Sequence, residues 1–268
     1  MTDHYADFDR LRFDRPAPRV LRITLDRGKA NEMDYRMHHQ VATVWEAIDN
    51  DPETSVSILT GAGRFFSAGG DFADEVKVIE EFDMRVTMWK DGRDLVRNLI
   101  NASKPIISAI NGPAAGGGLV AAMLADISIA GKSAKIVDGH TRLGVAAGDH
   151  ASLYWPLATS FAKAKYYLLT CDRLSGEEAE KMGLVTLCVP DDELQAKAIA
   201  VASRLAAGAP SAIRWTKYAL NNWYRQAWPI LDASLALEML GFGGPEVKEG
   251  LAAHLEKRPT RFDPKCSI

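Results

Sequence analysis

The chain has 268 residues, of which 47% are hydrophobic and 25% are charged, and its formal net charge is −3 at pH 7. This is the composition of a globular protein long enough to bury one large core or two smaller ones. The slightly acidic balance argues against a nucleic-acid binder or an anionic-membrane binder, since such proteins usually display an excess of basic residues.

The N-terminal stretch MTDHYADFDRLRFDR is charged and lacks the apolar centre of a secretory signal, and nowhere do 18 apolar residues run together. The three cysteines, Cys171, Cys188 and Cys266, have no metal-like spacing and are an odd number. They fit a reducing compartment better than a disulfide framework. We therefore expect a soluble cytoplasmic protein with neither a membrane nor a nucleic-acid partner.

Strands and helices alternate in the predicted element order until about residue 190, after which only helices are expected. Strands are predicted from β-branched or alternating apolar runs at 20–25, 55–60, 106–110, 126–130 and 184–189. Helices are predicted from apolar spacing of three and four residues after Asp34, and at 75–101, 117–125, 195–210, 211–225 and 245–257. This order indicates an α/β core over 1–190 and a helical region over 191–268.

Two glycine-rich turns each follow a predicted strand: RFFSAGGDF (64–72) and INGPAAGGGLVAAMLAD (110–126). Neither has the spacing of a dinucleotide or phosphate-binding loop, and Phe65 stands where a serine-hydrolase elbow requires glycine. Either turn alone is consistent with an ordinary tight turn. Together they could aim two backbone N–H groups into one cleft, an arrangement that stabilises an oxyanion.

Four segments, in chain order, carry a family resemblance: FSAGGDF, SKPIISAINGPAAGGGLVAAMLADISIA, LSGEEAEKMGLVTLCVP and VKEGLAAHLEKRPTRF. They resemble the enoyl-CoA hydratase/isomerase (crotonase) superfamily over about residues 18–262. The resemblance implies an α/β fold built as a spiral of ββα turns with a C-terminal helical trimerisation region. It also implies a homotrimer or dimer of trimers, and a CoA thioester substrate. Coenzyme A would enter as part of the substrate, with no other cofactor.

The same resemblance places the family's two oxyanion donors on the N–H groups of Gly70 and Gly117. A thioester carbonyl would lie nearly against the backbone there, with a helix N-terminus behind it, so a side chain would obstruct it. The resemblance also assigns residues to the CoA moiety, namely Lys29, Ala30, Ala68 and Lys257. Lys257 would reach a CoA phosphate across a subunit boundary. The alternative for either lysine is a solvated surface charge.

The catalytic glutamates of the family's hydratases are absent from this sequence. The first would stand two residues after GGG, at Val120, and the second aligns with His140. Nine residues after His140, Asp149 lies in GDHASLYWP. That stretch resembles β-diketone hydrolases, which pair the aspartate with a histidine, and aryl-CoA dehalogenases, in which the aspartate attacks the ring.

We expect His140 to act as a base, with a pH profile that rises near the ordinary histidine pKa of about 6.5. Asp149 would orient the imidazole or attack the substrate directly. The alternatives are a structural histidine, and an Asp149 that caps a helix beginning near Ala151. His150 is expected to point elsewhere.

No metal site is expected, because His38 and His39 are adjacent on a helix and cannot share a face. Other residues could line an acyl pocket or simply pack in the core: Trp89, Arg93, Asp94, Tyr154 and Trp155.

Three functions remain open. The leading one is an enoyl-CoA hydratase-like lyase that works through an oxyanion-stabilised thioester enolate without the usual two glutamates. The second is a hydrolase in which water activated by His140 attacks a β-diketone C–C bond or a thioester. The third is a non-catalytic crotonase-fold scaffold. The missing glutamates favour the scaffold, whereas the two glycine turns and the pair of His140 and Asp149 favour an enzyme.

Overall fold

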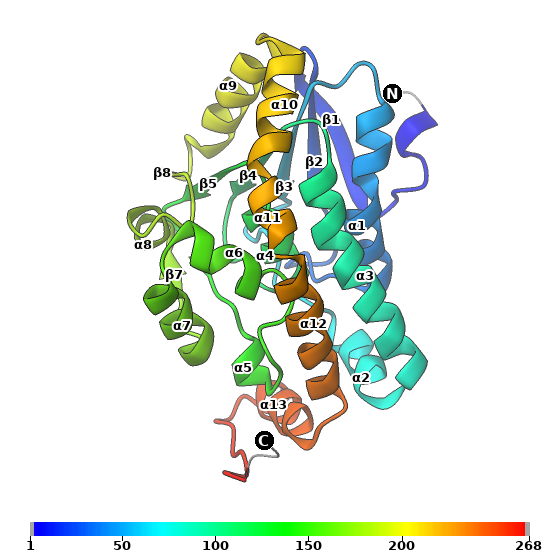
Figure 1. The fold of residues 1–268 in the computed structure, drawn as a ribbon, viewed down its shortest axis with the longest axis vertical. Helices are drawn as coiled ribbons and strands as arrows, with labels where there is room; N and C mark the ends of the chain where they lie inside the picture. The colour runs from blue at the N-terminus through cyan, green and yellow to red at the C-terminus, as the bar shows by residue number, and fades with distance from the viewer. Residues whose placement is uncertain (1–2, 266–268) are drawn as a thin grey trace.

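The structure is a computed structural model that describes residues 3–265, so Cys266 lies outside the described part. Its centre is a six-stranded sheet in the order β1-β2-β3-β4-β5-β8 (Figure 1). The strands are β1 (Leu11–Ala17), β2 (Val20–Leu25), β3 (Val56–Gly61), β4 (Ile106–Ile110), β5 (Ile127–Gly131) and β8 (Leu187–Val189). Strand β1 runs antiparallel to β2, and the other neighbours pair in parallel. A small second sheet pairs β6 (Lys135–Ile136) with β7 (Leu174–Ser175).

The helices lie on both faces of the sheet and beyond one end of it (Figure 1). They are η1 (Asp3–Tyr5), α1 (Tyr35–Asn50), α2 (Phe72–Glu80), α3 (Phe82–Asn101), α4 (Gly116–Met123), α5 (His140–Leu143), α6 (Ala151–Ala158), α7 (Phe161–Thr170), α8 (Gly176–Lys181), α9 (Leu194–Ala206), α10 (Pro210–Leu220), α11 (Asn222–Gln226), α12 (Trp228–Phe242) and α13 (Pro245–Leu255). None of the helices in the described part is long and apolar enough to cross a membrane.

Helix α1 forms where its sequence predicts it. Asp34 caps its N-terminus, since the Asp34 carboxylate accepts a hydrogen bond of 2.8 Å from the N–H of Met37. The residues spaced three and four apart, among them Val41, Trp45 and Ile48, are buried against the core. Capping and an apolar stripe therefore agree on the position of this helix.

The long helix expected at 75–101 is instead two helices. Glu81 has extended backbone angles (φ −108°, ψ 119°), which ends α2 and starts α3. Neither glycine nor proline stands at this break. Strand β1 was not expected either, because LRFDRPA mixes charged residues with a proline and gives no clear alternation.

The helices after residue 190 are packed onto the core. Helix α9 covers one face of the sheet, where Ala198 and Ala202 contact Ile58 and Ile107 in one apolar cluster. Helices α1, α3 and α4 cover the opposite face. Helix α12 packs against α3. The predicted boundary at 190/191 thus marks a change in element type within one packed structure.

The two glycine turns meet at the carboxyl ends of β3 and β4. Ser67 and Ala114 form a parallel bridge, and the N–H of Ala115 donates to the carbonyl of Ser67 at 3.0 Å. A Cβ on Gly116 would lie only 2.8 Å from Cα of Gly69, so the two backbones touch. Gly116 also has a positive φ of 53°, a conformation that glycine adopts without strain.

Candidate active site

A cavity of about 690 Å³ opens beside the two glycine turns. Both predicted oxyanion glycines and both predicted catalytic side chains line it, together with the residue at the position of the family's first glutamate: Gly70, Gly117, Val120, His140 and Asp149. The fold thus brings together residues from two turns, from α5 and from the loop before α6. Helices α2, α3, α12 and α13 complete the walls.

The two predicted oxyanion glycines, Gly70 and Gly117, have little room for side chains. A Cβ on Gly70 would collide with the carboxyl group of Glu75, and a Cβ on Gly117 would lie 2.9 Å from Cδ2 of His38. Gly117 is in the first turn of α4, where backbone N–H groups lack partners inside the helix and the helix dipole favours negative charge. The N atom of Gly70 lies 3.3 Å from the position of a Cβ on Gly116. Two backbone segments able to donate to an anion are therefore adjacent.

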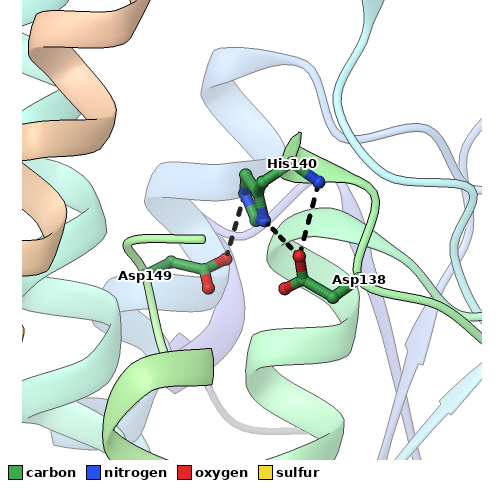
Figure 2. A group of neighbouring side chains, drawn as sticks. All are labelled: Asp138, His140 and Asp149. Atoms are coloured by element: carbon green, nitrogen blue, oxygen red, sulfur yellow. Dashed lines mark hydrogen bonds and ion pairs between the residues drawn. The ribbon is translucent and has the colours of Figure 1, made fainter. Parts of the chain in front are cut away.

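His140 reaches the cavity from the first position of α5 and is held by a buried aspartate (Figure 2). Its Nδ1 lies 3.0 Å from Oδ1 of Asp138, and its backbone N–H also donates to that oxygen at 3.3 Å. Its Nε2 lies 3.7 Å from Oδ2 of Asp149 and 3.6 Å from Oε1 of Glu238. These two separations exceed hydrogen-bond length, so Nε2 is free to engage another molecule.

The charge on His140 differs from the sequence expectation. Burial by itself would lower the pKa of the imidazole, but the carboxylates of Asp138, Asp149 and Glu238 outweigh burial and raise that pKa well above 6.5. The expected pH profile that rises near 6.5 is therefore wrong for this site. The raised pKa favours the imidazolium, the form of the ring that donates protons.

Asp149 is ionised and held from the side facing away from His140. Its Oδ1 accepts hydrogen bonds from Nδ1 of His150 at 2.8 Å and from the N–H of His150 at 2.5 Å. Burial would raise the pKa of Asp149, but His150 and His140 outweigh it and hold that pKa well below its usual value. The expectation that His150 points elsewhere is wrong, because it contacts Asp149 and also accepts from Nε1 of Trp155 at 3.4 Å. Asp149 does not cap α6, since the N-cap residue is His150.

Several acidic residues of the cavity region escaped the sequence reasoning, among them Glu75, Asp138 and Glu238. Burial, aided by neighbouring carboxylates, raises the pKa of Glu238 to about 8 against the opposing charge of His140. Burial also raises the pKa of Glu75. The cavity thus holds two glutamates with raised pKa values, from α2 and α12 rather than from the family's positions. Glu238 interrupts an apolar run in α12, and that interruption is the one signal in the sequence that could have found it.

His38 and His39 do share a partner. Their Nδ1 atoms lie 2.5 Å and 2.7 Å from the two oxygens of Asp91, a buried residue of α3. Only His38 of these two lines the cavity. The two imidazole–carboxylate contacts join α1 to α3.

The predicted CoA-binding residues lie around the cavity mouth with one exception. Ala68 lines the cavity, and its N–H donates to the carbonyl of Ala30 at 2.9 Å. Lys29 is exposed in a shallow depression that shares Phe72 with the cavity. Lys257 is exposed just after α13 and does not line the cavity of the described chain.

In the described part of the chain, the other candidate pocket residues do not line the cavity. They are Trp89, Arg93, Asp94, Tyr154 and Trp155. Arg93 stacks over the Trp89 ring at 5.0 Å, and Asp94 pairs with Lys90. Tyr154 and Trp155 are buried in the hydrophobic core, so of the two alternatives they follow core packing.

Asp138, His140 and Asp149 also offer ligand atoms within 4.8 Å of one another, a spacing that suits a cation. Metal binding needs a neutral imidazole, and the same carboxylates that would attract the cation favour the protonated ring. That no metal is required stays a prediction.

Comparison with known proteins gives the family. The enoyl-CoA hydratase/isomerase family model matches residues 17–265. A probable enoyl-CoA hydratase of Rhodobacter capsulatus is 31% identical over 90% of this chain and 93% of its own. The 1,2-epoxyphenylacetyl-CoA isomerase of Escherichia coli is 31% identical over 92% and 95%. A crystal structure of an enoyl-CoA hydratase/isomerase from Mycobacterium paratuberculosis superposes with a TM-score of 0.86 at 32% identity, covering 91% of this chain and 97% of that one.

The chain therefore belongs to the enoyl-CoA hydratase/isomerase family and is an enzyme of that family with the crotonase-type α/β fold. The family and fold implied by the four sequence segments are confirmed.

Proposed function

We propose that the protein is a hydro-lyase that interconverts a 3-hydroxyacyl-CoA and a 2-enoyl-CoA through a thioester enolate. The observation that carries the proposal is the meeting of both glycine turns in the cavity that His140 enters. The thioester oxygen would bind between the N–H groups of Gly70 and Gly117. Two such donors are worth several kcal/mol together, since losing one in comparable sites costs about 3 kcal/mol.

The chemistry at the β-carbon falls to His140. In the dehydration direction a basic group of the cavity first takes the α-proton, and the C–H electrons form the enolate. Nε2–H of His140 then protonates the hydroxyl that leaves the β-carbon as water. The C–O electrons leave with oxygen, and the enolate electrons form the new C=C bond. In the hydration direction the neutral ring takes the proton from the attacking water. Asp138 fixes the ring, and Asp149 stabilises its positive charge.

The CoA moiety would lie at the cavity mouth, with Ala30, Ala68 and Lys29 near its adenine and phosphates. Lys257 would reach a phosphate from a neighbouring subunit. Coenzyme A is then part of the substrate, and no other cofactor is needed. We further propose a homotrimer or dimer of trimers in the cytoplasm, supported by the exposed aromatic and aliphatic side chains of α10 to α12.

The test is hydration of crotonyl-CoA and longer or cyclic enoyl-CoA thioesters by the purified enzyme, followed through the enoyl absorbance. His140→Gln should lower kcat by about 10²–10⁴ with KM little changed, because acid–base assistance is lost while the donors remain. Wild-type kcat in this variant, or no turnover of any enoyl-CoA by the wild type, would reject the proposal.

A hydrolase is the second candidate, favoured by Val120, which makes the position of the family's first glutamate apolar. His140 and Asp149 would then activate water against a carbonyl carbon of a thioester or a β-diketone. Release of free thiol from an acyl-CoA, or of a carboxylate from a cyclic β-diketone, identifies this outcome.

A further inference from the structure

Of the three histidines that line the cavity in the described chain, His38 and His140 have matching geometry. His140 places Nδ1 against the buried Asp138, and His38 places Nδ1 against the buried Asp91 at 2.5 Å. Each imidazole has 14% of its side-chain surface exposed. In each case the aspartate fixes the ring and leaves Nε2 as the atom available to a ligand. This is the arrangement of an aspartate-supported acid or base.

The two histidines differ in what they approach. A Cβ on Gly117 would meet three atoms first: Cδ2 of His38 at 2.9 Å, Sδ of Met33 at 3.1 Å and Nε2 of His38 at 3.3 Å. The imidazole of His38 therefore lies against the glycine whose N–H is the proposed oxyanion donor. A thioester bound there presents its α-carbon, one bond from the carbonyl carbon, to the same region.

Joining α1 to α3 does not require His38 to face the cavity. His39 makes the same kind of contact with the other oxygen of Asp91 at 2.7 Å, and its side chain is 52% exposed. The pair thus contains one imidazole that faces the cavity and one that serves only the contact between helices. A comparison of variants at His38 and His39 can therefore separate a structural role in the helix contact from a chemical role in the cavity.

We propose that His38 is a second catalytic residue, which exchanges a proton with the α-carbon of the bound thioester. Nε2 takes the α-proton, and the C–H electrons form the enolate, whose oxygen is held by Gly70 and Gly117. Nδ1–H stays with Asp91, whose carboxylate stabilises the resulting imidazolium. In the hydration direction the same proton returns to the α-carbon. The assignment rests on the proposed function, in which His140 acts only at the β-carbon.

Glu75 is the rival group at this end of the cavity. Its carboxyl group contacts Gly70, and its charge interacts with those of both His38 and His140. Burial raises the pKa of Glu75 toward the range that suits acid–base catalysis, so Glu75 competes with His38 for the α-proton. A Glu75→Gln variant therefore belongs in the test.

The α-proton step can be isolated with a saturated thioester, butyryl-CoA, which has no β-hydroxyl to lose. Incubation in D₂O followed by mass spectrometry measures exchange at the α-carbon. The wild type and His39→Gln should exchange, whereas His38→Gln should lose about 10²–10⁴ of the rate. Binding of butyryl-CoA by His38→Gln should stay within a few-fold of wild type. Free imidazole should restore exchange to His38→Ala, which gives a second variant with its own readout.

Three outcomes would overturn the assignment of His38 while leaving the enolate intact. They are full exchange in His38→Gln, equal loss in His38→Gln and His39→Gln, and loss in Glu75→Gln alone. If the wild type binds butyryl-CoA but exchanges nothing, the enolate of the proposed function fails, and the assignment fails with it.

Discussion

His140 shows how neighbours decide the role of a residue. From its type alone a base working near pH 6.5 is the natural expectation, yet three carboxylates around a buried ring favour the charged form. The raised pKa turns the residue from a proton acceptor at neutral pH into a donor. Sequence spacing located the residue, but its charge state depends on Asp138 and on Glu238, which lies nearly a hundred residues away.

Asp138→Asn tests this charge state. Removing one carboxylate should lower the pKa of His140 toward 6.5, while the amide keeps the shape of the side chain. As a general acid His140 works below its pKa, so kcat for dehydration should fall with rising pH at a lower midpoint in the variant. The raised pKa also stabilises the fold below about pH 6.5, and that contribution is lost as pH rises through the folded-state pKa. NMR titration of the ring and kcat–pH profiles measure the shift, and unchanged midpoints would contradict it.

Gly117→Val tests the oxyanion site through a single residue. The new side chain would press on His38 and Met33 and fill the space beside the N–H group. We expect kcat/KM to fall by at least about 10²–10³, the usual effect of one lost donor, with the fold retained by circular dichroism. Gly92→Ala is the matched control for adding a Cβ elsewhere in the cavity wall, since its nearest contact would be an ordinary 3.5 Å to Leu235. Undiminished activity of a folded Gly117→Val would remove the oxyanion assignment.

At the level of elements, the strands and helices with strong local sequence patterns could be predicted. Features that depend on tertiary packing could not. The strands β2, β3 and β4 coincide with the predicted runs within one residue, because buried parallel strands are continuous apolar segments. The break at Glu81 has no glycine or proline that would have predicted it, and the helix that it ends, α2, lines the cavity. The approach of Glu75 and Glu238 to one cavity likewise depends on how whole helices pack.

Helix α3 offers a stability test. Gly92 lies in its interior, where glycine is less favourable than alanine by about 0.5–1 kcal/mol. A Cβ there meets only Leu235 at van der Waals distance, so no strain opposes the change. Gly92→Ala should raise the free energy of unfolding by about 0.4–1 kcal/mol in urea titrations. A destabilised variant would mean that α3 and α12 pack more tightly at this point than the 3.5 Å contact indicates.

At the level of the whole molecule, the helices after residue 206 leave large apolar side chains uncovered. Trp215 is 72% exposed and Leu240 is 73% exposed, and Trp223 and Leu237 are exposed as well. A stable monomer rarely leaves so many large apolar groups in water, and burying one side chain of this size is worth about 1.5–3 kcal/mol. These helices are therefore the expected contact region of the trimer or dimer of trimers.

Sedimentation equilibrium at micromolar concentration should give three or six times the 29.3 kDa chain mass. Trp215→Glu and Leu240→Glu would each place a charge in the contact, so at least one should shift the distribution toward smaller species. Lys163→Glu, on the exposed surface of α7, is the charge-change control and should leave the mass unchanged.

If Lys257 reaches the CoA phosphate of a neighbouring subunit, the dissociated variant should also show a higher KM for CoA thioesters, whereas the control should not. A single-chain mass for the wild type, with undiminished activity, would contradict both the assembly and the shared site.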